Sequence, residues 1–365
     1  MRVSGFLLLL LFASFSAPAA AQSLTEHVLK VGQDERSYLM MTPDGPPGPR
    51  PVVIALHGAG QNAEGFRGYF GLDATARAKG FIAVYPQGQG RVWNDGRPAA
   101  MRLTGVLRPG DDVPFLVTLA HKLVSEGIAD PRRIYLVGIS NGGFMVERMA
   151  CEFPHVFAAF TAIMATTPAN YREECTPSHP VPITFIHGTA DSVIAYDGFW
   201  TPMGATLSAP DSAGLFARLN GCGDATTRKL PDLDRWDGTS VSEQRWDACE
   251  NGSVVRLLTV ERGGHQSPAR VDTDVSLGST FLGLRNRDID AGEEAWRFMS
   301  AFSLPAAKVA EEKPKPAARE RRAPAVRPDA AQPLPSASSA YAPPAGNSKP
   351  RSPAEADKAG GTSLW

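Results

Sequence analysis

The chain has 365 residues, which exceeds one average domain and falls short of two. Hydrophobic residues make up 43% and charged residues 21%, so most of the chain can bury a core. The 37 basic and 38 acidic side chains give a net charge of −1, which excludes a strongly basic surface for nucleic acid as the main feature.

The first residues predict a secretory signal peptide over residues 1–21. Arg2 supplies a positive start, residues 6–12 form an apolar run, and small residues before Gln22 form a cleavage site. The apolar run is well below the ~20 residues that span a bilayer. No other stretch is apolar enough, so we expect no stable insertion into a membrane. We expect a secreted or periplasmic protein that is cleaved after Ala21.

Residues 22–303 predict one folded domain that begins with strands. Two short alternating runs, 26–31 and 35–41, flank Gly32-Gln33-Asp34 and predict an opening hairpin. Longer, continuous apolar runs are typical of strands that are buried on both faces. These runs cover residues 51–56, 81–85, 133–139, 157–164, 181–186 and 254–260.

Helical patterns lie between these strands, over residues 112–126, 141–153 and 291–302. Strand–helix alternation of this kind predicts an α/β fold, in which a mainly parallel central sheet has helices on both faces. Ligands on such sheets bind beyond the carboxyl ends of the strands. The candidate functional residues are therefore sought at the strand ends.

The strand over residues 133–139 is followed by Ser140, within the sequence Gly138-Ile139-Ser140-Asn141-Gly142. A Gly-x-Ser-x-Gly motif alone is a weak indication. Between a strand and a helix it predicts a tight, strained turn that exposes the serine hydroxyl. Ser140 is therefore the candidate nucleophile, and a glycine-rich helix start without chemistry is the alternative.

A serine hydroxyl needs a base that takes its proton. His265 is the expected base, because it follows the last predicted strand in the loop Arg262-Gly263-Gly264-His265-Gln266. His57 and His187 also lie at strand ends. We expect these two histidines to shape the site and contact the substrate, not to act as bases.

The base in turn needs a carboxylate that fixes its tautomer and stabilises its charged form. Asp191 lies just after a buried strand, and Asp197 is the alternative. The order Ser140, Asp191, His265 along the chain is the order of a serine hydrolase triad on a sheet of this kind.

Developing negative charge on the substrate needs two backbone N–H donors, which form an oxyanion hole. One donor is expected to be Asn141, the residue after the nucleophile. The other is expected to be Ala59, in the loop after the first buried strand, although Gly60 could also serve.

Cys151, Cys175, Cys222 and Cys249 are the four cysteines of the chain. In an exported protein an even number of cysteines indicates disulfides, and four allow three pairings. We favour the local pairing, Cys151 with Cys175 and Cys222 with Cys249. No Cys-x-x-Cys pair exists, so we expect no zinc site and no other metal.

Residues 304–365 predict a disordered, proline- and alanine-rich tail. They contain 11 Pro, ten basic and six acidic residues, and only two aromatic side chains. Such a segment cannot bury enough apolar surface to offset its ordering entropy. The tail carries a net charge of +4, which leaves a mildly acidic domain before it.

Several short motifs between about residue 50 and residue 302 together carry a resemblance to a known family. They are Leu56–Gly60, Tyr85–Gly88, Trp93–Arg97, Asp111–Val113, Gly138–Gly143, His187–Asp191, Asn220–Cys222 and Gly263–His265. With these motifs the chain resembles the secreted α/β-hydrolase esterases of the poly(3-hydroxybutyrate) depolymerase and feruloyl esterase type, within carbohydrate esterase family one and its relatives.

This resemblance implies the α/β-hydrolase fold, Ser140 as the nucleophile, and Asp191 and His265 as its partners. It also implies a sequence-local disulfide near the histidine loop. Gln266-Ser267-Pro268 departs from the family, which often has an aromatic residue and Pro-Gly after the catalytic histidine. Because of this departure, the resemblance does not define the acyl pocket, and hence does not define the substrate.

The loop that contains Trp93 and Arg97 follows another strand end, so it is expected at the rim of the site. An aromatic ring with a guanidinium suits a phenolic or carboxylate-bearing substrate. The alternative is that Trp93 packs a long loop against the sheet.

The sequence therefore predicts a secreted serine esterase that hydrolyses carboxylic esters through an acyl-enzyme and needs no cofactor. The expected substrates are hydroxyalkanoate oligomers, or feruloyl and acetyl esters of sugars. Two alternatives stay open, a serine peptidase on the same fold and a non-catalytic binding protein with a hydrolase-like scaffold.

Overall fold

The structure is a computed structural model, and it describes residues 23–97, 111–201, 204–271 and 281–305. The predicted signal peptide and nearly all of the predicted tail lie outside the described residues. No helix within the described ranges is long and apolar enough to cross a membrane.

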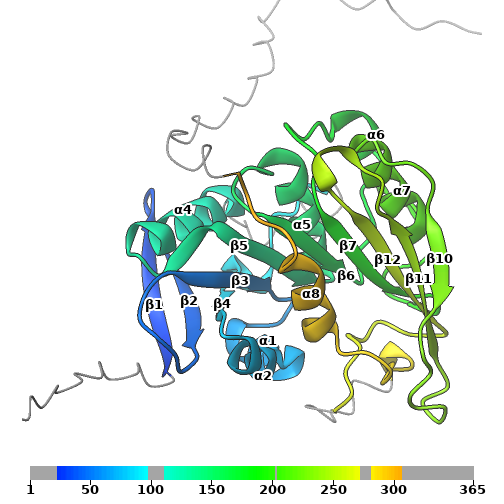
Figure 1. Cartoon of the computed structure of the whole chain (residues 1–365), viewed down its shortest axis with the longest axis horizontal. Coiled ribbons are helices and arrows are strands. Elements are labelled where there is room, and N and C mark those ends of the chain that lie inside the picture. The colour runs from blue at the N-terminus through cyan, green and yellow to red at the C-terminus, as the bar shows by residue number, and fades with distance from the viewer. Residues whose placement is uncertain (1–22, 98–110, 202–203, 272–280, 306–365) are drawn as a thin grey trace, which may run out of the picture. The chain divides into compact units, whose positions relative to one another are not determined.

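One large mixed sheet forms the centre of the fold (Figure 1), and the described residues contribute ten strands to it. Its strands are β1 (Ser23–Val31), β2 (Asp34–Thr42), β3 (Arg50–Leu56), β4 (Ile82–Pro86), β5 (Ala129–Ile139), β6 (Ala159–Ile163), β7 (Ile183–Gly188), β10 (Thr226–Lys229), β11 (Ser240–Trp246) and β12 (Val255–Glu261). Two short strands, β8 (Trp200–Thr201) and β9 (Gly204–Ala205), pair separately.

The strands lie in the order β1-β2-β4-β3-β5-β6-β7-β12-β11-β10. Neighbours from β4 to β12 run parallel, while β1, β2, β10 and β11 pair antiparallel at the two edges. The carboxyl ends of β3, β5, β7 and β12 therefore meet along one edge of the sheet. This confirms the predicted α/β fold, with the strand arrangement of an α/β hydrolase.

Helices cover both faces of the sheet (Figure 1). One apolar core packs helices α4 (Asp112–Ser125), α5 (Asn141–Glu152) and α7 (Ala209–Leu219) against the sheet, and a second packs α1 (Ala63–Phe70), α2 (Leu72–Lys79) and α8 (Ala291–Met299). Alternate residues of β3 from Val52 to Leu56 enter the two cores, so this part of the strand is a continuous apolar run. The short helix α6 (Tyr171–Glu174) follows β6.

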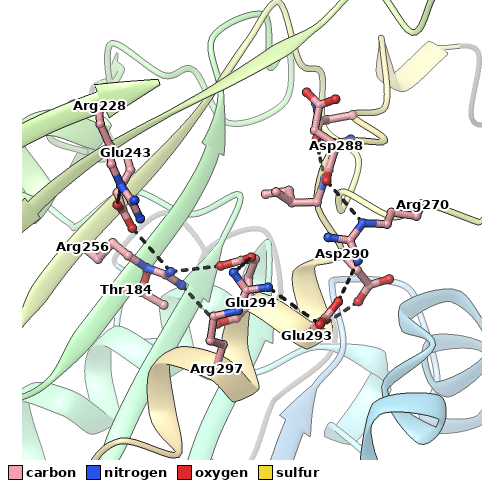
Figure 2. A network of polar contacts seen from close by, with 12 residues as sticks. Thr184, Arg228, Glu243, Arg256, Arg270, Asp288, Asp290, Glu293, Glu294 and Arg297 are labelled. Carbon is pink, nitrogen blue, oxygen red and sulfur yellow. Dashed lines mark hydrogen bonds and ion pairs between the residues drawn. The ribbon is translucent and has the colours of Figure 1, made fainter. Parts of the chain in front are cut away.

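A buried ion cluster fixes α8 to the sheet (Figure 2). The guanidinium of Arg256, on β12, lies 3.0 Å from a carboxylate oxygen of Glu294 and 3.7 Å from one of Glu243. Its Nε also donates to the Thr184 hydroxyl at 2.9 Å. Burial lowers the pKa of Arg256, and the two carboxylates oppose that shift. The cluster holds β12, the strand that leads to His265, against its neighbours.

Two disulfides join Cys151 with Cys175 and Cys222 with Cys249, so the favoured local pairing is confirmed. The first joins the end of α5 to the residue after α6. The second lies before the start of β12, whereas His265 follows the carboxyl end of that strand. The expectation of a disulfide near the histidine loop was therefore wrong, because a seven-residue strand separates the two.

Candidate active site

Ser140 lies at the sharp turn between β5 and α5. Its φ of 52° and ψ of −121° are strained for a residue with a side chain. The turn needs glycine on both sides, because a Cβ at Gly138 would lie 2.3 Å from the Gly142 carbonyl oxygen, and one at Gly142 would lie 2.5 Å from the Leu56 carbonyl oxygen. The spacing of the motif thus follows from close backbone contacts, as the sequence predicted.

His265 joins Ser140 and Asp191 in one hydrogen-bonded line. Its Nε2 lies 3.1 Å from the Ser140 hydroxyl oxygen, and its Nδ1 lies 2.7 Å from Oδ2 of Asp191. The imidazole is about 10% exposed, and the Asp191 carboxylate is fully buried. The structure thus brings together the three residues that the sequence singled out, and Asp197 is exposed outside this line.

The Asp191 carboxylate is held in place from its other side. Its Oδ1 accepts the backbone N–H groups of Val193 and Ile194, at 2.9 and 2.8 Å. His187 lies beside it, with Nε2 3.5 Å from Oδ2 of Asp191 and 2.8 Å from the Ile194 carbonyl oxygen. Burial lowers the pKa of His187, and the contacts with the Ile194 and Ala165 carbonyls and with Asp191 oppose that shift. Asp191 therefore presents one oxygen to His265 while the loop fixes the other.

Two backbone N–H groups flank Ser140 without a hydrogen-bond partner among the described residues. They belong to Ala59 and to Asn141, at the N-terminus of α5. The N–H of Gly60, by contrast, donates to the Arg91 carbonyl at 2.8 Å. Of the two residues that the sequence left open for the first donor, Ala59 is therefore the one with an available N–H.

His57 fixes the loop that carries Ala59. Its Nε2 accepts the Gly88 N–H at 2.9 Å, so Nδ1 carries the proton and donates to the Gly58 carbonyl at 2.8 Å. The ring is fully buried, and burial lowers its pKa. Both ring nitrogens are thus used within the protein.

Trp93 and Asn141 lock a second loop onto the nucleophile turn. The indole N–H donates to the His57 carbonyl at 2.9 Å, and the side-chain oxygen of Asn141 accepts the Trp93 N–H at 2.7 Å. Asp95 accepts from the Asn141 amide at 2.6 Å and from Arg97 at 2.7 Å. The Arg97 guanidinium lies 3.5 Å from the centre of the Phe144 ring.

These contacts correct the prediction that His57, Trp93, Arg97 and His187 contact the substrate. His57, Trp93 and His187 are at most 1% exposed, and Arg97 is paired with Asp95, so none of the four lines the pocket at Ser140. They hold the loops on which the catalytic candidates lie. For Trp93 the structure shows the alternative, because its side chain is buried and packs its loop against the neighbouring backbone.

A pocket of about 550 Å³ opens over Ser140 and His265. Such a volume can hold both the acyl group and the alcohol group of a small ester. Most of its lining residues were not predicted from the sequence, although Met164 directly follows the carboxyl end of β6, where ligands on such sheets bind. The missed lining residues include Gln61, Asn62, Tyr69, Arg91, Met164, Val193 and Leu282.

Metal ligands do not cluster in the described part of the chain, where no group of three or more His, Cys, Asp or Glu side chains could hold an ion.

Residues 36–167 match the family model described as "Esterase PHB depolymerase", which covers the strands and loops around Ser140. The match includes Ser140 and ends before Asp191 and His265, so it shows a likeness to that family over the first part of the folded region. The chain is a carboxylic ester hydrolase, as the sequence predicted.

Similarity to individual proteins covers more of the chain. "Putative esterase NocK" of Nocardia uniformis subsp. tsuyamanensis is 28% identical over 303 residues, which are 77% of this chain and 84% of that protein. "Feruloyl esterase B" of Piromyces equi is 25% identical over 283 residues, 74% of this chain. The match spans less than half, 46%, of the Piromyces protein.

Among solved structures, an acetyl xylan esterase from Aspergillus awamori is similar, with a TM-score of 0.48 and 15% identity. The match covers 71% of this chain and 97% of that one.

Proposed function

We propose that this protein is an exported serine esterase in which Ser140 is the nucleophile, His265 the general base and acid, and Asp191 the residue that orients His265. The observation that carries the proposal is the continuous line of contacts from Asp191 through His265 to Ser140. Nucleophile, base and orienting carboxylate within hydrogen-bond reach are what acyl transfer by serine requires.

In the first half-reaction, the Ser140 oxygen bonds to the ester carbonyl carbon while His265 Nε2 takes the hydroxyl proton. The carbonyl oxygen becomes negative and accepts the N–H groups of Ala59 and Asn141. The ester C–O bond then breaks, and His265 returns its proton to the departing alcohol. Ser140 is left as an acyl ester.

In the second half-reaction, a water molecule attacks the acyl carbon as His265 takes its proton. The same two N–H groups stabilise the oxyanion, and the C–O bond to Ser140 breaks as His265 returns the proton to the serine oxygen. Throughout, Asp191 accepts the Nδ1–H of His265 and stabilises its charged form. The acid and the free enzyme are the products.

The proposed substrates are hydroxyalkanoate oligomers and feruloyl or acetyl esters of sugars. Support comes from the family model, which is named for poly(3-hydroxybutyrate) depolymerase, and from the relative named feruloyl esterase. Export is proposed because the two disulfides need an oxidising compartment.

The test compares hydrolysis of hydroxybutyrate oligomers, methyl ferulate and acetylated xylan with that of 4-nitrophenyl acetate. We expect at least one natural ester to be cleaved faster, and Ser140→Ala to lower kcat by about 10⁴-fold or more. Ser125→Ala, at an exposed serine on α4, is the matched control and should keep wild-type activity. Unchanged hydrolysis by Ser140→Ala would refute the proposal.

A further inference from the structure

Arg91 contributes a positive charge to the pocket that holds Ser140 and His265. It is exposed and lines the pocket. Among the described lining residues, Arg91 is the only Lys or Arg, and none is Asp or Glu. Arg91 therefore attracts anions to the pocket, and no described lining residue carries a negative charge that would oppose it.

The guanidinium of Arg91 has no ion pair or hydrogen bond to any described residue. Neighbouring arginines differ: Arg67 pairs with Glu64 and Asp73, and Arg97 pairs with Asp95. A planar guanidinium presents several N–H donors in a fork that fits a carboxylate. Arg91 thus has its binding capacity available to a ligand.

The backbone holds Arg91 in a conformation that disfavours a side chain. Its φ is 63°, a value that glycine adopts more easily, and the neighbouring residue Gly90 has the same φ. Arg91 N–H donates to the Gly88 carbonyl at 3.0 Å, and the Arg91 carbonyl accepts the Gly60 N–H at 2.8 Å. The second bond ties Arg91 to the loop that carries Ala59.

From these observations we infer that Arg91 is a specificity-determining residue that binds a carboxylate of the substrate, so that the preferred esters carry a free carboxylate in their acyl or alcohol part. The inference rests on the proposed function, because it concerns which esters that site selects. Arg91 takes no part in bond making, and neutral esters remain substrates without it.

Two pairs of substrates test the inference, and each pair differs mainly in charge. In the acyl part, 4-nitrophenyl hydrogen adipate ends in a carboxylate where 4-nitrophenyl hexanoate ends in a methyl group. In the alcohol part, 3-(butyryloxy)butyrate is compared with its N-methylamide. The measured quantity is the ratio of kcat/KM for the charged ester to kcat/KM for the neutral one.

We expect Arg91→Gln to lower this ratio by about tenfold in at least one pair, with little change for the neutral ester. Arg91→Lys should restore part of the ratio, since it keeps the charge. Added salt should lower the wild-type ratio and leave that of Arg91→Gln almost unchanged. The pair that responds identifies the part of the substrate that Arg91 contacts.

The matched control is Arg218→Gln, at an exposed arginine of α7 that does not line the pocket and has no ion pair among the described residues. It should leave both ratios unchanged. Equal ratios for wild type and Arg91→Gln in both pairs, with neutral esters still cleaved, would overturn the inference and leave the proposed function standing. A wild-type protein that cleaves no ester would overturn both.

Discussion

The Nε2 atom of His265 lies 3.1 Å from the hydroxyl oxygen of Ser140, although 125 residues separate them along the chain. The fold brings them together because β5 and β12 end at the same edge of the sheet, with β6 and β7 between them. Asp191 reaches the same place from the end of β7.

Asp191→Asn should lower kcat by about 10⁴-fold at neutral pH, with little change in stability. The amide oxygen can still accept the N–H groups of Val193 and Ile194, but an NH₂ facing His265 favours the wrong tautomer of the imidazole. Steady-state kinetics with a neutral ester measure the effect. Asp197→Asn is the control at an exposed aspartate, and a large loss there with normal Asp191→Asn kinetics would reverse the assignment.

Gly142→Ala should reduce both stability and activity. The added Cβ would lie 2.5 Å from the Leu56 carbonyl oxygen, so the turn that carries Ser140 must shift, and overpacking of this kind costs about 1–3 kcal/mol. Gly68→Ala is the control, because a Cβ there meets nothing within 4 Å and alanine favours the helix α1. Urea unfolding and ester kinetics on both variants give the comparison, and equal stability of the two would count against the close contact.

The parallel strands were predictable because burial on both faces leaves a continuous apolar run. The observed β5 begins at Ala129, four residues before the predicted start, since its first residues are partly polar. Helices α1 and α2 were missed because each is only eight residues long. The strand β11, which lies next to the edge strand β10, was missed because its polar residues interrupt the continuous apolar run by which the central strands were predicted.

The triad candidates were predictable because their order along the chain and their positions at strand ends are properties of the sequence. The supporting residues were not. Whether Trp93 meets the substrate or the backbone of His57 depends on how two distant loops pack. Likewise, pairing with Asp95 removes Arg97 from the pocket, while Arg91 lines it.

Acidification should destabilise the protein partly through His57. Burial lowers its pKa in the folded state, so the unfolded chain binds more protons below its usual pKa of about 6.5. The free energy of unfolding should therefore fall as the pH drops from 6.5 toward the lower, folded-state pKa. For one such histidine the loss is at most about 2 kcal/mol between pH 7 and pH 5.

His57→Gln isolates this contribution, because glutamine can accept the Gly88 N–H and does not titrate. Urea unfolding at pH 7 and pH 5 should show a smaller loss of stability for the variant than for the wild type. Equal losses would mean that His57 has the same pKa in the folded and unfolded states.

Arg256→Met should destabilise the fold by about 3–5 kcal/mol, because it leaves the carboxylates of Glu243 and Glu294 buried without their shared cation (Figure 2). Arg297→Met is the matched control. Arg297 also pairs with Glu294, but it is 58% exposed, so we expect about 1 kcal/mol or less. Similar midpoints of urea unfolding for the two variants would argue against a dominant role for the buried pair.

The most direct test of the central claim is the site of covalent labelling by a fluorophosphonate, read by intact mass and peptide mapping. A fluorophosphonate loses fluoride as an activated serine oxygen bonds to its phosphorus. We predict a single adduct on the peptide that contains Ser140, much slower labelling of His265→Ala, and none of Ser140→Ala. An adduct on another residue, or no adduct on folded protein that still hydrolyses esters, would contradict the assignment of Ser140 as the nucleophile.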